Sequence, residues 1–226
     1  MKIYINEQQV KSLFEAKMDG FDVNVLAVAK SFKERVEYCK KMLGFPIGNG
    51  SSRMVFQLDD ETCLKLAKNA KGIAQNKEET MISLDRIISY VPKVYDGSDE
   101  ENGLWIITQY VLPAKKEDFR RVLGVDFNDV ANFAINTDRR FMYGSYLSKI
   151  GDRITHELYE KYENNDDVID LFNDIHELKA DYNQCVADLS GIRNWGMVSD
   201  NGEVSMVMLD IGLSEEVYNQ YYKRRL

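Results

Sequence analysis

The spacing of hydrophobic and polar residues changes period several times along the chain. Residues 2 to 6 alternate as in a short strand, and residues 7 to 16 then place apolar side chains at helical spacing. Residues 25 to 43 carry apolar side chains on one recurring face, which predicts a single long amphipathic helix that ends before Gly44.

The next 60 residues are rich in predicted strands. Two apolar runs in residues 52 to 68 are joined by the acidic residues 59 to 61, which predicts a β-hairpin. Residues 72 to 91 return to helical spacing. Residues 91 to 113 read as two strands around an acidic, glycine-containing turn, so the first half of the chain is strand-rich around one helix.

The second half is mainly helical. The periodicity between residues 115 and 187 predicts helices at about 116 to 123, 126 to 150, 152 to 162 and 166 to 186. A hairpin over residues 194 to 210 follows, because Asn201 and Gly202 are a strong hairpin turn signal. A final helix begins at Glu215. These patterns predict a β-rich domain over residues 1 to 111 and a helical domain over residues 112 to 226.

Composition narrows the functional classes. The chain has 226 residues, 44% of them hydrophobic, with a formal net charge of -8. That charge disfavours general binding to a nucleic-acid backbone, and no apolar stretch is long enough to predict a membrane span. The three cysteines are odd in number and widely spaced, which fits a reducing cytoplasm.

Candidate chemistry in the first half lies on the predicted hairpin. Gly48 and Gly50 precede its first strand, and Val55 lies seven residues after Gly48. Lys65 lies ten residues further on, between two leucines of the return strand, and the alternation alone favours a solvent-facing Lys. Two adjacent carboxylates, Glu78 and Glu79, follow on the next predicted helix, and helical phase does not choose between them.

Candidate chemistry in the second half lies around the last hairpin. Asp188 begins the stretch DLSGIRN, which ends at Asn194, and Asp210 follows sixteen residues later in LDIG, at the end of an apolar strand. Each of these residues also has a structural interpretation, since Asp and Asn often cap helices or stabilise turns.

Taken in order, these features resemble the protein kinase-like superfamily, and most closely its small, divergent members such as aminoglycoside-phosphotransferase-like and phage-encoded kinase-like proteins. The resemblance extends over residues 44 to 213. It implies a two-lobed α+β kinase-like fold with a β-rich N-terminal lobe, one αC-like helix and a mainly helical, shortened C-terminal lobe.

The resemblance also implies roles for individual residues in binding ATP and Mg²⁺. Gly48 and Gly50 would form a loop around the phosphates, and Val55 would cover one face of adenine. Lys65 would pair with Glu79 (or Glu78). Thr108 would be the gatekeeper, and the backbone groups of Gln109 and Val111 would contact the adenine edge. Asp188 would accept the proton of the acceptor hydroxyl, with Lys65 acting on the phosphates. Asn194 and Asp210 would hold Mg²⁺.

The chain departs from the family pattern in three ways. Asp188 and Asn194 are six residues apart where the family has five, VAD stands where the family has HRD, and sixteen residues follow Asp210. Two functions therefore stay open. One is an ATP-dependent phosphotransferase that transfers the γ-phosphate to a hydroxyl of an unidentified small-molecule or protein acceptor. The alternative is a pseudokinase that acts as a nucleotide-binding or partner-binding module.

Overall fold

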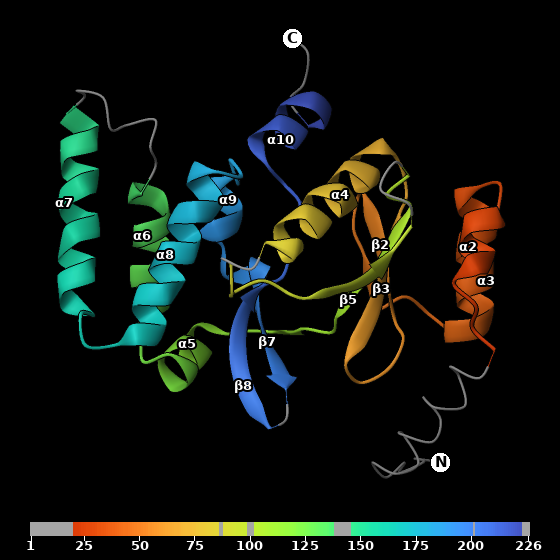
Figure 1. The fold of residues 1–226 in the computed structure, drawn as a ribbon, viewed down its shortest axis with the longest axis horizontal. Coiled ribbons are helices and arrows are strands. Elements are labelled where there is room, and N and C mark those ends of the chain that lie inside the picture. Colours follow the sequence, from red (N-terminus) through yellow and green to blue (C-terminus); the bar gives the residue numbers. More distant parts are fainter. Residues whose placement is uncertain (1–19, 86–87, 99–101, 138–145, 201, 223–226) are drawn as a thin grey trace, which may run out of the picture. The chain divides into compact units, whose positions relative to one another are not determined.

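A computed structural model describes residues 20–85, 88–98, 102–137, 146–200 and 202–222, with the backbone alone for residues 146–152 and 200. The chain has a mixed α+β architecture and forms two compact units (Figure 1). The first unit contains the described residues up to Lys77 together with Val94–Tyr110. The second contains Glu78–Lys93 and the chain from Val111 onward. The strand predicted at residues 2 to 6 and the helix predicted at residues 7 to 16 lie outside the described residues.

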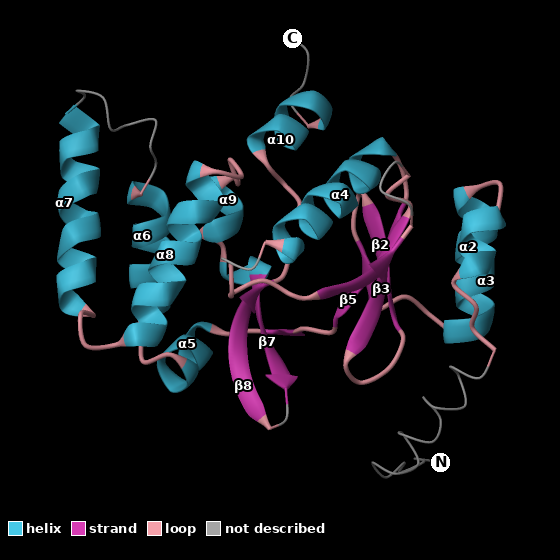
Figure 2. Ribbon diagram, in the orientation of Figure 1, coloured by secondary structure: helices cyan, strands magenta, loops and turns pink. Residues whose placement is uncertain are grey.

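The first unit is built on a five-stranded antiparallel sheet in the order β1-β2-β3-β5-β4 (Figure 2). Its strands are β1 (Gly48–Asn49), β2 (Arg53–Gln57), β3 (Thr62–Ala67), β4 (Val94–Gly97) and β5 (Trp105–Gln109). The predicted β2–β3 hairpin is confirmed. Its turn needs no glycine because Asp59 Oδ1 accepts the backbone N–H groups of Glu61 and Thr62 at 2.8 and 2.6 Å.

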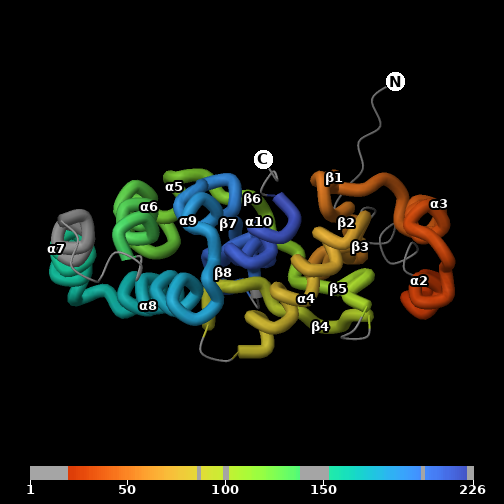
Figure 3. The backbone as a smooth tube through the Cα atoms, turned by 90° about the horizontal axis from the view of Figure 1, so that it is seen from above, coloured from red at the N-terminus to blue at the C-terminus, as the bar shows by residue number. Residues whose placement is uncertain are grey.

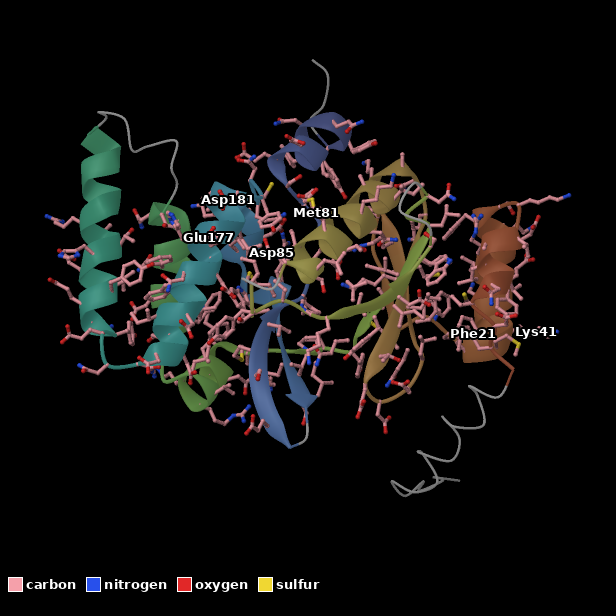
Figure 4. The ribbon with its side chains drawn as sticks, viewed as in Figure 1. Phe21, Lys41, Met81, Asp85, Glu177 and Asp181 are labelled. Carbon is pink, nitrogen blue, oxygen red and sulfur yellow. The ribbon has the colours of Figure 1, made fainter. Side chains whose placement is uncertain are left out.

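One face of this sheet packs on α2 (Asn24–Val28) and α3 (Phe32–Leu43). The prediction of one long helix over residues 25 to 43 is therefore wrong. Ser31 is extended, with φ of -141°, and its side chain accepts the N–H of Glu34 at 3.2 Å, so it caps a new helix instead of continuing the first. Phe21, labelled in Figure 4, stacks on Tyr38 of α3.

The helix predicted over residues 72 to 91 is α4 (Ala70–Leu84), so its predicted C-terminal end is wrong. Tertiary contacts decide where it stops. The buried Asp174 accepts the backbone N–H groups of Ser89 and Tyr90 at 2.6 and 2.8 Å, and Ile88 packs in the core of the second unit. Those donors are thereby unavailable to a helix.

Four helices follow one another in the second unit, namely α5 (Lys116–Val122), α6 (Phe127–Asn136), α7 (Tyr146–Lys161) and α8 (Asp166–Ala180). Figure 3 shows α6 alongside α7 and α8, and Phe133 of α6 stacks on Phe172 of α8 with centroids 4.2 Å apart. The prediction of one helix over residues 126 to 150 is wrong, because α6 ends at Asn136. The break expected at residue 151 is also wrong. Gly151 lies inside α7, where an interior glycine costs only about 1 kcal/mol.

The helix predicted over residues 166 to 186 ends early as well, because α8 stops at Ala180. Asn183 has φ of +49°, a left-handed conformation that interrupts a helix, and a short helix, α9 (Val186–Leu189), begins after it. A 3-10 turn over Ile192–Asn194 leads into the last hairpin.

The predicted final hairpin is confirmed as β7 (Trp195–Asp200) and β8 (Glu203–Met208), and β6 (Leu112–Pro113) adds a third strand. Gly202 supplies the positive φ of the turn, at +87°, while Asn201 lies outside the described residues. The last helix, α10, spans Glu215–Tyr221. Among the described helices, none is both long and apolar enough to cross a membrane.

Candidate functional site

The predicted residues of the first unit lie in one row across the sheet. Gly48 pairs with Val55, Val55 with Lys65, and Lys65 with Ile106. Directly opposed residues of antiparallel strands share a face, so these four positions lie on the same face. Their neighbours in sequence lie on the other face, which is covered by α2 and α3. The hairpin register thus brings Gly48, Val55 and Lys65 together.

Lys65 is buried, with 7% of its surface exposed, so the solvent-facing interpretation of the alternating pattern is wrong. Its strand lies in the middle of the sheet, between β2 and β5. Asn76, a fully buried residue of α4, donates to the carbonyl oxygen of Lys65 at 3.5 Å and to that of Gly103 at 2.9 Å. The middle of α4 is thereby attached to β3 at Lys65 and to the segment that precedes β5.

The glycine-containing loop is a tight turn. The N–H of Gly50 donates to the carbonyl of Arg53 at 3.0 Å, so it is used within the loop. Neither Gly48 nor Gly50 has a positive φ. A Cβ would meet Val55 at 3.4 Å from Gly48 and the Arg53 carbonyl at 3.6 Å from Gly50, which are ordinary contacts. The fold therefore does not require glycine at either position.

Sequence reasoning missed a basic residue, Lys68, that contacts this turn. The ammonium group of Lys68 donates to the side chain of Asn49 and to the carbonyl of Gly50. The backbone N–H of Lys68 donates to the Ser52 carbonyl at 2.8 Å. The β2–β3 register could have revealed this position, because Arg53 pairs with Ala67 and the next residue is Lys68. The N–H groups of Ser51 and Ser52, at the tip, donate to no other group among the described residues.

The predicted adenine-contacting residues belong to different units. Thr108 is fully buried, and its hydroxyl lies 3.3 Å from the sulfur of Cys63. Gln109 ends β5 in the first unit, paired with Thr62. Val111 begins the next segment of the second unit and packs there with Val198 and Val207.

The two carboxylates of α4 have different surroundings. Glu78 accepts a hydrogen bond from the Ser214 hydroxyl. Burial raises the pKa of Glu78, the charge of Glu216 raises it further, and the Ser214 hydrogen bond lowers it. Glu79 is fully buried, with 0% of its surface exposed. Glu78 therefore interacts with the segment around Ser214. This favours Glu79 as the carboxylate that the resemblance pairs with Lys65.

In the second unit the structure brings Asp188 and Asn194 together. Asp188 lies in α9, and the 3-10 turn folds Asn194 back over it. The side-chain nitrogen of Asn194 donates to Asp188 Oδ1 at 2.8 Å and to the Asp188 carbonyl at 3.1 Å. Gly191 permits this fold, since a Cβ there would lie 2.9 Å from the carbonyl of Ala187.

Trp195 fixes the far end of this loop. Its side chain is fully buried, its Nε1 donates to the Leu189 carbonyl at 2.9 Å, and its ring packs edge-on against Phe119 at 5.3 Å. Gly196 comes next, and a Cβ there would lie 2.4 Å from Val111 Cγ1. Close packing between β6 and β7 thus requires a glycine at residue 196.

Asp210 lies two residues after the end of β8. The N–H of Leu209 donates to the Asn194 carbonyl at 2.7 Å, so the two ends of the hairpin meet beside Asn194. Burial raises the pKa of Asp188 above its ordinary value, and the charge of Asp210 raises it further. The hydrogen bond from Asn194 and the charge of Arg193 lower it. Asp188, Asn194 and Asp210 therefore form one group of oxygen-bearing side chains, which we call the Asp188 loop site.

The Asp188 loop site fits a hard divalent cation. Asp188 Oδ2 is buried and has no hydrogen-bond partner among the described residues. Across those residues, no group of three or more His, Cys, Asp or Glu side chains is arranged to hold a metal. Mg²⁺ does not need such a group, because it usually binds one or two carboxylates and retains several waters.

The acidic residues at the ends of α4 and α8 form a second polar cluster. Asp85, Glu177 and Asp181 are labelled in Figure 4, and Tyr182 donates its hydroxyl proton to Asp85. The hydrogen bond to Asp85 is the main cause that raises the pKa of Tyr182 to about 12, with burial and the three carboxylate charges adding to it. This cluster lacks glycine-rich or metal-binding features, and we assign it a structural role in joining α4 to the end of α8.

The fold defines a mixed α+β protein in which a five-stranded antiparallel sheet and a largely helical unit each carry part of the predicted site. No protein-family model, curated protein or solved structure matches this chain. The functional argument therefore depends on its own residues.

Proposed function

We propose that the protein is a small kinase-like phosphotransferase that uses ATP and Mg²⁺ to phosphorylate a hydroxyl group. The observation that carries the proposal is the Asp188 loop site, where two carboxylates and one carboxamide are gathered on one loop and the hairpin that follows it. Phosphoryl transfer depends mainly on positioning and on neutralising phosphate charge, which this chemistry suits.

The first unit supports the nucleotide part of the proposal. The helix that follows β3, α4, occupies the place along the chain of the αC-like helix that the resemblance implies. The fold does not require glycine at residues 48 and 50. The absence of a side chain at both positions leaves space for a group that approaches the turn from outside. The N–H groups of Ser51 and Ser52 and the ammonium of Lys68 are the donors that phosphate oxygens bind.

Each residue then has a role in the proposed reaction. Lys65 binds phosphate oxygens, and Glu79 orients it. Bound Mg²⁺ would neutralise the charge of the transferring phosphoryl group, with Asn194 and Asp210 to hold it. Asp188, by its place in the loop, orients the acceptor hydroxyl and takes its proton.

One observation favours the alternative of a module that binds nucleotide without transferring phosphate. A proton acceptor must reach its substrate, whereas Asp188 Oδ2 is excluded from solvent and Oδ1 is occupied by Asn194. The absence of the HRD residues before Asp188 agrees with this alternative.

Thermal unfolding with and without Mg²⁺-ATP tests nucleotide binding. At a hundredfold excess over the dissociation constant, binding should stabilise the protein by about 2.7 kcal/mol. Gly50→Ala should leave the stability of the free protein within about 0.5 kcal/mol, because its Cβ has room, but should reduce the ATP-dependent shift. Lys33→Ala, on the exposed surface of α3, is the control that should change neither.

Release of ADP from ATP, with and without hydroxyl acceptors, then separates the two functions. Binding with turnover that Asp210→Asn abolishes supports the phosphotransferase. Binding without turnover across the acceptors supports the nucleotide-binding module. No thermal shift at millimolar Mg²⁺-ATP would contradict both, and with them the kinase-like assignment.

A further inference from the structure

The orientation of the Asn194 side chain departs from what a metal-binding Asn would need. Its two hydrogen bonds end on the Asp188 carbonyl and on Asp188 Oδ1, and both of these atoms only accept hydrogen bonds when the carboxylate is ionised. The NH₂ end of the amide therefore faces Asp188. Asn194 holds Asp188 in place through one of its two carboxylate oxygens.

The other oxygen of Asp188 has no such partner. Oδ2 is buried and accepts no hydrogen bond, and no Lys or Arg forms an ion pair with Asp188 in the described part of the chain. A buried acceptor without a partner costs about 1–3 kcal/mol, and more when it is charged. Folded proteins rarely retain such an atom unless something binds it.

A second carboxylate, that of Asp210, acts electrostatically on Asp188. The hydrogen bond from Leu209 to the Asn194 carbonyl, at 2.7 Å, brings Asp210 to the same loop, and its charge acts on Asp188. Two nearby carboxylates repel each other when both are ionised. A divalent cation removes the repulsion and supplies the missing partner of Oδ2.

We propose that Asp188 is itself a ligand of the divalent cation, bound through Oδ2 together with Asp210, and that Asn194 is a positioning residue that holds Asp188 Oδ1. The inference rests on the proposed function only in assigning a cation to the Asp188 loop site. It replaces the roles proposed above for two residues. Asn194 positions Asp188 and does not bind the cation, and Asp188, with one oxygen on Asn194 and the other on the cation, does not take the acceptor's proton.

The longer spacing between Asp188 and Asn194, where this chain departs from the family pattern, fits this arrangement. Six residues separate Asp188 and Asn194, and the 3-10 turn of Ile192–Asn194 returns Asn194 to Asp188. Gly191 permits that return, since a Cβ would lie 2.9 Å from the Ala187 carbonyl. The same turn brings the Asn amide and the Asp carboxylate into contact.

The cation site should therefore exist without nucleotide. The test uses Tb³⁺ alone, with emission excited through the indole of Trp195, the residue next to Asn194, and displacement of Tb³⁺ by Mg²⁺. Wild-type protein should show one saturable site. Asp188→Asn and Asp210→Asn should each weaken Tb³⁺ binding at least about tenfold, and Asn194→Ala should weaken it by about 10–100-fold, the usual effect of losing a positioning partner.

Two further variants make the result specific. Glu203→Gln removes an exposed carboxylate from the same hairpin and should leave the affinity unchanged. Asp188→Glu keeps the charge but moves the oxygens, so a ligand role predicts a loss of Tb³⁺ affinity, whereas a purely long-range charge effect predicts none. Far-UV circular dichroism of each variant should match that of the wild type.

The outcomes separate this inference from the proposed function. Tb³⁺ binding that is unchanged in Asp188→Asn or retained in Asp188→Glu overturns the ligand role, even if Mg²⁺-ATP binding and turnover are present. Conversely, a Tb³⁺ site that depends on Asp188 in a protein that does not bind ATP upholds the ligand role and contradicts the kinase-like function.

Discussion

The two tryptophans allow one substitution to be compared at two buried sites, only one of which has a hydrogen bond to the indole N–H among the described residues. Trp195 and Trp105 are the only tryptophans in the chain, and their exposed fractions are 0% and 4%. Nε1 of Trp195 donates to the Leu189 carbonyl at 2.9 Å, whereas Nε1 of Trp105 is buried and has no hydrogen-bond partner among the residues that the structure describes. Replacing each with Phe removes a similar volume from a packed core.

The hydrogen bond sets the expected difference. Trp195→Phe leaves the buried carbonyl of Leu189 without its donor, which costs about 1–3 kcal/mol beyond the lost packing. Trp105→Phe removes an unpaired donor and so recovers a penalty of about 1–3 kcal/mol. We expect Trp195→Phe to be the more destabilising variant by at least about 2 kcal/mol.

Urea denaturation followed by far-UV circular dichroism measures this difference. With a urea dependence of about 2 kcal/mol per molar, the midpoints of the affected transitions should shift by amounts that differ by about 1 M. The fluorescence of the remaining tryptophan reports whether the packing around it is retained in each variant. Equal losses in the two variants, or a larger loss for Trp105→Phe, would refute the reasoning.

Three further predictions concern other contacts. Gly196→Ala should destabilise the second unit by about 1–3 kcal/mol in urea titration, because the new Cβ would lie 2.4 Å from Val111, and an unchanged midpoint would contradict the packing of β6 on β7. Ser31→Ala should cost about 0.5–2 kcal/mol by the same measurement, because it removes the cap of α3; Lys33→Ala should cost little. Burial raises the pKa of Asp174. The favourable contribution of this carboxyl group to stability is therefore complete below about pH 4 and is lost as the pH rises through its folded pKa. Stability measured from pH 4 to 7 should decline less in Asp174→Asn than in the wild type, and parallel curves for the two proteins would argue against that contribution.

The local elements that sequence analysis predicted well are those set by near neighbours. The hairpin over residues 52 to 68 was predicted from alternating residues around an acidic turn, and the last hairpin from Asn201 and Gly202. In both, the turn residues and the strands that they join are adjacent in the chain, so periodicity and turn chemistry contain the necessary information. The cross-strand row of Gly48, Val55 and Lys65 follows directly from the register of such a hairpin.

The helix ends that were predicted wrongly depend on distant partners. The hydrogen bonds from Ser89 and Tyr90 to Asp174, 85 and 84 residues away, divert donors that a longer α4 would need. Burial likewise overrode the local pattern at Lys65, whose alternating neighbours suggested exposure. Helix propensity is a weak local preference of at most about 1 kcal/mol for most residues, and tertiary packing readily exceeds it.

The candidate site divides in the same way. The sequence alone identified the candidate residues, because Asp188, Asn194 and Asp210 stand at the ends of short apolar segments. Their arrangement in space depends on the tertiary fold. The turn of Asn194 onto Asp188 and the meeting of Leu209 with Asn194 are contacts between segments that no periodicity relates. The orientation of an amide and the isolation of one carboxylate oxygen depend on three-dimensional packing, and for that reason the role of Asp188 had to be inferred from the structure.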